Sequence, residues 1–119
     1  MLAAAGAGCE GMFSLTPLER LESFSAEVPL DVADRLLMEA ARRHERTLNR
    51  GAQAQDRRQR REYRATILIG RCMLLAEGDG SAARMTFTVS LEAPHNDPCV
   101  DRLRPVFVEA RAGFASVGH

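Results

Sequence analysis

Residues 42–64 concentrate positive charge in a way that restricts what this chain can fold into. Nine arginines fall in this segment against three acids, whereas the rest of the 119-residue chain is net negative and the total charge is zero. From residue 52 to 64 the segment holds strong helix formers and a single large apolar side chain, Tyr63. This composition predicts an exposed helix that continues to about Arg71.

Drawn on one helix at about 100° per residue, the arginines of this segment gather on one face, with Arg58 as the exception. None of the three acids of the segment lies on that face. Like charges then stack one and two turns apart, and each such pair costs about a few tenths of a kcal/mol. The pattern predicts an arginine face that obtains its negative charge from elsewhere. The candidate nucleic-acid-binding residues on this face are Arg42, Arg43, Arg46, Arg50, Arg57, Arg60, Arg61 and Arg64.

Three sources of that negative charge remain open: nucleic-acid phosphates, an acidic protein surface, and the acids of residues 1–41. The first source predicts a non-catalytic accessory protein that binds nucleic acid non-specifically, with an affinity that falls steeply with salt. The second predicts a helical protein-interaction module, such as an adaptor, an inhibitor or a chaperone-like dimer. An unbroken helix from Leu30 to Arg71 would be about 60 Å long and implies either a projecting arm or a helical homodimer, whereas a turn at Gly51 gives a helical hairpin. Of these states we expect a homodimer.

One short stretch carries a family resemblance. The sequence from Arg57 to Arg64, followed by Ile67-Leu68-Ile69-Gly70, resembles small accessory proteins of conjugative plasmid mobilisation, in which an arginine-rich helix runs into an apolar stretch. The resemblance implies a DNA-associated role for the arginine face.

The clearest other elements are expected from capping and periodicity. Residues 16–19, Thr-Pro-Leu-Glu, form a capping box that predicts a short helix ending near Ser25. Residues 30–48 place apolar side chains three and four apart, which predicts an amphipathic helix. Residues 85–91 alternate strictly between apolar and polar, which predicts a strand.

Three further stretches are less regular. Residues 66–76 form an apolar block that fits either a helix or a buried strand. Residues 77–81 hold two glycines and an aspartate and are predicted to form a turn. Residues 100–110 contain Pro105, which predicts either a helix that begins at or after this proline or a strand over residues 106–108.

The predicted fold is therefore α+β and helix-dominated, with a short capped helix, a long or hairpinned basic helix and a small C-terminal β element. We expect a disordered leader over residues 1–14 and a single small domain over residues 15–112. Within this domain, residues 16–77 are expected to be helical and residues 84–110 to contain the β element. Residues 113–119 are expected to form a flexible tail.

The sequence offers little for catalysis or metal binding. The cysteines, Cys9, Cys72 and Cys99, are odd in number and widely spaced, which argues against a disulfide framework and predicts a cytoplasmic location. His95, Asp97 and Cys99 lack the second ligand pair of a zinc site, so they are expected to cap a loop rather than hold a metal. We expect no cofactor, no catalytic residue and no enzyme activity. No apolar run approaches the ~20 residues of a membrane span.

Overall fold

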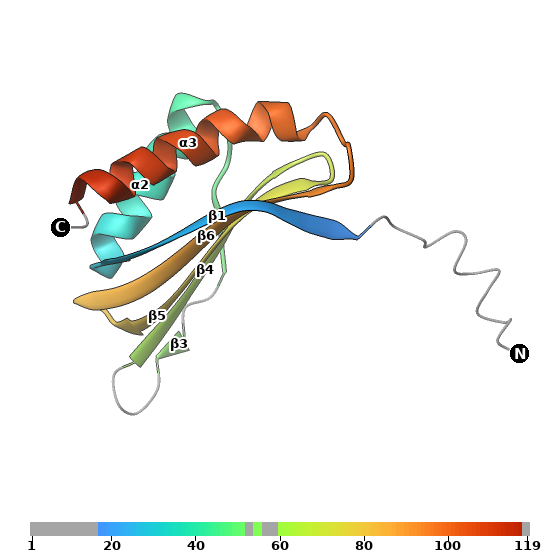
Figure 1. The fold of residues 1–119 in the computed structure, drawn as a ribbon. Coiled ribbons are helices and arrows are strands. Elements are labelled where there is room, and N and C mark those ends of the chain that lie inside the picture. Colours follow the sequence, from blue (N-terminus) through green and yellow to red (C-terminus); the bar gives the residue numbers. More distant parts are fainter. Residues whose placement is uncertain (1–16, 52–53, 56–59, 118–119) are drawn as a thin grey trace, which may run out of the picture.

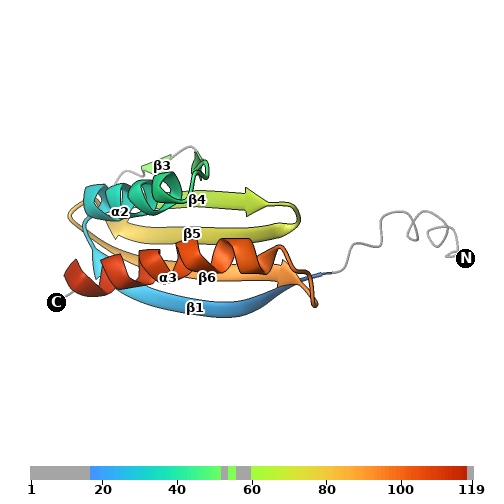
Figure 2. The same cartoon turned by 90° about the horizontal axis from the view of Figure 1, so that it is seen from above.

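In the computed structural model, which describes residues 17–51, 54–55 and 60–117, two helices lie on one face of an antiparallel sheet (Figures 1 and 2). None of the helices in these residues is long and apolar enough to cross a membrane. Along the chain the elements are β1 (Leu18–Val28), α2 (Leu30–Arg43), β2 (Asn49–Arg50), β3 (Ala54–Gln55), β4 (Arg60–Ile69), β5 (Cys72–Ser81), β6 (Arg84–Pro94) and α3 (Val100–Val117).

The sheet has the strand order β1-β6-β5-β4, with the short strands β2 and β3 both paired to β4. All of these pairings are antiparallel. The strands β4, β5 and β6 form a meander, and its first turn uses Gly70 with a φ of +58°, a conformation that glycine adopts without steric cost. The first strand of the described residues, β1, pairs only with the last, β6, and so lies at one edge of the sheet.

The helix-dominated fold prediction is wrong, because the second half of the arginine-rich segment is a strand. In β4 the buried residues alternate with exposed ones, and Tyr63, Ala65, Ile67 and Ile69 all face the helices. This period of two fits a half-buried strand and not a helix. The arginines that seemed to form a helical face occupy the more exposed positions of this strand. The fold is α+β as expected, but the sheet dominates it.

The short N-terminal helix predicted from the capping box is also wrong. Residues 18–28 form β1, which pairs with β6 along almost its whole length, with a bulge between Arg20 and Glu22. Toward its C-terminal end Phe24, Ala26 and Val28 turn to the helix side and become progressively buried. Pairing over ten positions outweighs a local capping signal, whose contribution is about 1 kcal/mol.

Other predictions are confirmed in part. The predicted strand at residues 85–91 lies within β6, and the amphipathic helix begins at Leu30 but ends at Arg43. The predicted turn at residues 77–81 is wrong, because these residues continue β5. The helix α3 begins five residues before Pro105 and runs to Val117, so the expectation that it starts at or after the proline is wrong.

The core between sheet and helices is built around aromatic side chains. Phe24 of β1 contacts Phe107 and Phe114 of α3, with ring centroids 5.5 and 5.4 Å apart. Phe87 of β6 contacts Tyr63 and Phe114 at 5.5 and 5.9 Å. These edge-to-face and tilted contacts join three strands to one helix.

Candidate binding surfaces

The predicted arginine face is not formed as one surface. Arg42 and Arg43 end α2, Arg46 lies in the following loop, and Arg50 is in β2. The remaining candidates are in β4, apart from Arg57, which lies outside the described residues: Arg60, Arg61 and Arg64. The described members of the set are thus divided between a helix, a loop and two strands. The binding role of these residues stays a prediction, but the single stripe that motivated it is absent.

Four of these arginines pair with acids of the same chain. The ion pairs are Arg43–Glu109 at 2.6 Å, Arg50–Asp34 at 2.8 Å, Arg60–Asp79 at 2.7 Å and Arg64–Glu77 at 3.4 Å. Only Asp34 belongs to residues 1–41, so most of the compensating charge comes from the C-terminal half. The hydrogen bond from Arg43 holds the pKa of Glu109 below its usual value, and His44 acts in the same direction.

Three candidates have no ion pair with the described part of the chain: Arg42, Arg46 and Arg61. Arg42 is exposed at the end of α2, whereas Arg61 is half-buried at the start of β4. The Nε atom of Arg46 is buried without a hydrogen-bond partner among the described residues. Among the described arginines of this segment, the unpaired positive charge is therefore smaller than their number suggests.

The one tyrosine of the chain ties the sheet to α2. The hydroxyl of Tyr63 donates to Asp34 Oδ1 at 2.8 Å, and Arg50 donates to the other carboxylate oxygen of Asp34 at 2.8 Å. Burial, with the hydrogen bond and charge of Asp34 added to it, raises the pKa of Tyr63 well above its usual value near 10. A buried tyrosine, a strand arginine and a helix carboxylate thus form one structural unit.

This unit predicts a pH dependence. Because the folded state raises the pKa of Tyr63, the stabilisation is fully present below the ordinary tyrosine pKa and is lost as the pH rises above about 10. We expect the native protein to show no tyrosinate absorbance at about pH 10, where an unfolded chain is half ionised. The chain has one tyrosine and no tryptophan, so a spectrophotometric titration reports on Tyr63 alone. An ordinary tyrosine titration in the folded protein would contradict the assignment.

The face of the sheet away from the helices, called here the open face, carries arginines and acids that pair with one another. Its ion pairs include Arg64–Glu77, Arg60–Asp79, Arg20–Glu92 and Arg84–Glu27. A shallow polar hollow of about 890 Å³ lies over its middle and is lined by both arginines and acids. A phosphate backbone entering this hollow would meet as many carboxylates as guanidiniums. The open face is therefore a poor surface for nucleic acid.

The two edges of the sheet differ. At one edge, the two-residue strands β2 and β3 pair with four residues of β4. At the other edge, β1 pairs with β6 on one side, and no strand of the described residues pairs with its outer side (Figure 2). Two leucines on this strand are strongly exposed, Leu18 by 43% and Leu21 by 41%. This edge strand of eleven residues can therefore offer its outward backbone N–H and C=O groups to another strand.

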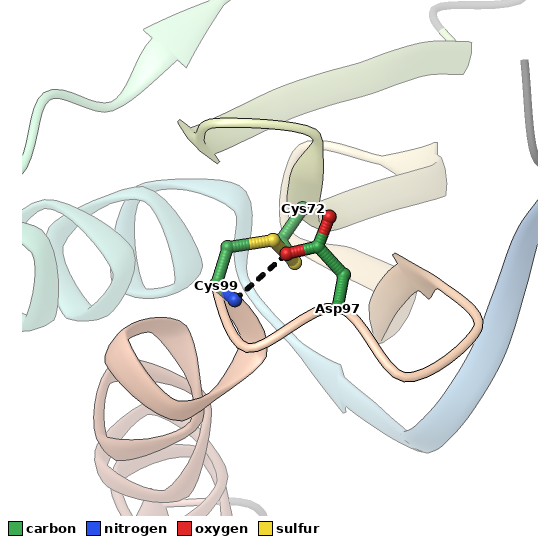
Figure 3. Close-up of side chains that lie close together, drawn as sticks. All are labelled: Cys72, Asp97 and Cys99. Carbon is green, nitrogen blue, oxygen red and sulfur yellow. Dashed lines mark hydrogen bonds between the residues drawn. A yellow bond between two sulfur atoms is a disulfide. The ribbon is translucent and has the colours of Figure 1, made fainter.

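The cysteine prediction needs correction, because Cys72 and Cys99 form a disulfide with their Cα atoms 5.9 Å apart. It joins the start of β5 to the residue before α3. The cysteines therefore no longer indicate a reducing compartment. Asp97 caps the loop as predicted, since its Oδ1 accepts the backbone N–H of Cys99 at 3.0 Å (Figure 3). Cys72 and Cys99 are 27 residues apart in the sequence, and only the meander brings them together, so their pairing could not be predicted from spacing.

No protein-family model, no curated protein and no solved structure matches this chain. The likeness of residues 57–70 to mobilisation accessory proteins gains no support from these comparisons. Moreover, residues 60–64, which the likeness implied to be helical, lie in the strand β4.

Proposed function

We propose that this chain is a non-catalytic protein-interaction module that works as a homodimer joined along β1. The observation that carries the proposal is the free edge of β1, since the opposite edge of the same sheet ends in the two-residue strands β2 and β3 and offers no comparable length of strand. Adding a strand to a sheet edge is a common mode of protein recognition, in which backbone hydrogen bonds supply affinity and side chains set the register. Homodimers with two-fold symmetry are the commonest oligomers of such domains.

The side chains of β1 favour one self-complementary register. A two-fold axis perpendicular to the sheet beside Phe24 places this residue opposite its own copy. Ser23 then lies opposite Ser25 of the partner subunit. With Leu21 as the bulge residue, Arg20 lies opposite Glu27 of the partner subunit on the open face, and symmetry repeats this contact. Cross-strand pairs of opposite charge and of aromatic rings stabilise a sheet, and no like charges are opposed in this register.

The bulge and the charges of β1 also oppose unspecific pairing. Edge strands are commonly protected by bulges and by charged residues, which exclude flat partners. A partner strand with matching charges and the same bulge is not excluded in this way. Arg20 and Glu27 are already paired with Glu92 and Arg84. Of these four side chains only Glu92 is mostly buried, and it also accepts a hydrogen bond from Ser90, so rearrangement of the exposed partners costs little.

A non-catalytic role is supported by where the perturbed ionisable groups lie. The raised pKa of Tyr63 and the lowered pKa of Glu109 both belong to contacts that hold helices in place. The competing hypothesis of nucleic-acid binding stays a prediction. It is weakened because four of its eight candidate residues are neutralised within the chain.

A charge swap tests the dimer. We expect the wild-type protein to sediment as a dimer, and Glu27→Arg to weaken dimerisation about tenfold or more, because two opposite-charge contacts become like-charge contacts. Arg20→Glu is expected to have the same effect, and the double variant Arg20→Glu/Glu27→Arg to restore the dimer. Analytical ultracentrifugation over a range of concentrations measures each dissociation constant.

The matched control is Glu62→Arg, an exposed acid on β4 that lies far from β1 in the strand order. It changes the net charge as Glu27→Arg does and is expected to leave the dissociation constant unchanged. A wild-type protein that stays monomeric at about 100 µM, a concentration at which even weak transient pairs associate, refutes the proposal. So does a dimer that is indifferent to the swaps.

A further inference from the structure

A cluster of three potential metal ligands lies where β5 begins and α3 is about to start. Cys72 is fully buried, whereas Asp97 and Cys99 are half-buried. One ligand atom from each of the three residues lies within 4.8 Å of the others. Figure 3 shows the two sulfur atoms bonded to each other with the Asp97 carboxylate beside them. The described structure is thus the oxidised form of this cluster.

We propose that reduction of the disulfide converts this cluster into a binding site for a thiophilic divalent cation such as Zn²⁺. The ligands are Sγ of Cys72, Sγ of Cys99 and a carboxylate oxygen of Asp97, and water completes the tetrahedron. This set combines the thiolate and carboxylate ligands that zinc accepts, with one open position. Neither the eight candidate nucleic-acid-binding arginines nor the β1 edge takes part, so the site is independent of the proposed dimer.

The charges around the cluster favour such a site. Two thiolates and one carboxylate carry −3, and a divalent cation leaves −1. Arg71 lies next to Asp97, with Nη2 3.3 Å from Oδ2, and balances this remaining charge. The 18-residue helix α3 begins at Val100, so the positive end of its dipole lies beside Cys99. A helix N-terminus and a neighbouring arginine both favour the thiolate form of cysteine.

The ligands are also held in position. Asp97 accepts the Cys99 N–H through Oδ1 and is paired with Arg71 through Oδ2, so contacts fix both carboxylate oxygens. Partners of this kind orient metal ligands in known sites. The Cα atoms of the two cysteines are 5.9 Å apart. Zinc–sulfur bonds of about 2.3 Å separate the sulfurs by about 3.8 Å, so they move apart by less than about 2 Å.

The chemistry of the conversion is balanced by an external dithiol. Its thiolate attacks Sγ of Cys99, because the sulfur of Cys72 is inaccessible, and Cys72 leaves as the thiolate. The second thiol of the reductant then releases Cys99, and the reductant ends as a disulfide. The cation next displaces the protons that remain on the two cysteines. Oxidation and metal binding therefore exclude each other at this site.

Cobalt is the probe for this site. The full chain is reduced with a phosphine, freed of reductant without oxygen, and titrated with Co²⁺. We expect one equivalent to bind with thiolate-to-cobalt absorption in the near ultraviolet and with the intense visible bands of tetrahedral cobalt, both of which Zn²⁺ abolishes. The oxidised protein is expected to show neither.

Variants separate this site from other cysteine chemistry. Cys9→Ser keeps two cysteines and is expected to leave the spectrum unchanged, whereas Cys99→Ser is expected to lose the spectrum of a two-thiolate site. Asp97→Asn leaves both cysteines in place and is expected to weaken cobalt binding at least tenfold; circular dichroism shows whether it folds. Absence of thiolate absorption in the reduced, folded chain overturns the proposal. So does a spectrum that survives Cys99→Ser, or full affinity in Asp97→Asn.

Discussion

Phe87→Ala is expected to lower the free energy of unfolding by about 3–5 kcal/mol, the largest effect of any single substitution considered. Phe87 is fully buried on the interior strand β6 and contacts Tyr63 on β4 and Phe114 on α3. Its ring also covers Gly78 on β5, where an added Cβ would lie 2.6 Å from the ring. Removal of this ring opens a cavity that touches three strands and a helix.

Urea unfolding followed by circular dichroism measures this loss. The matched control is Leu68→Ala, because Leu68 is 56% exposed on the open face and its truncation is expected to cost less than about 1 kcal/mol. A loss below about 1.5 kcal/mol for Phe87→Ala would show that the layers do not meet at this ring.

Local signals in the sequence were sufficient where one pattern acted alone. Residues 85–91 alternate in a period of two, and α2 shows the spacing of an amphipathic helix, so both elements were predictable. In β4 two signals competed. The arginines are good helix formers, but the alternation of Tyr63, Ala65, Ile67 and Ile69 is a strand signal, and burial of these four side chains decides the outcome.

The charge partners of the arginines were not predictable from spacing along the chain. Arg64 meets Glu77 because the register of β4 with β5 places them directly opposite. Arg50 meets Asp34 because β2 and α2 both flank Tyr63. These contacts depend on strand order and register. When residues 42–71 are drawn as one helix, residues three and four apart are placed together instead. The one-sided arginine face was a product of that projection.

The double variant Cys72→Ser/Cys99→Ser is expected to lose about 3–4 kcal/mol of stability relative to the oxidised protein. A crosslink between residues 27 apart restricts the unfolded chain, and the loop-entropy relation gives a loss of this size. The disulfide also holds the start of α3 against the start of β5. The helix α3 supplies Phe107 and Phe114 to the core. Urea unfolding of oxidised wild type, of Cys9→Ser and of the double variant measures the effect.

Cys9→Ser is expected to have the same free energy of unfolding as the oxidised wild type, since it leaves the disulfide intact. A double variant within about 1 kcal/mol of the wild type would mean that the disulfide restrains little of the unfolded chain. Reduced wild-type protein in the presence of a chelator is expected to match the double variant. Addition of Zn²⁺ at about 100 times its dissociation constant is then expected to restore about 2.7 kcal/mol to the reduced wild type alone. The double variant lacks both thiolates, so the same addition leaves it unchanged, and this difference assigns the recovery to Cys72 and Cys99.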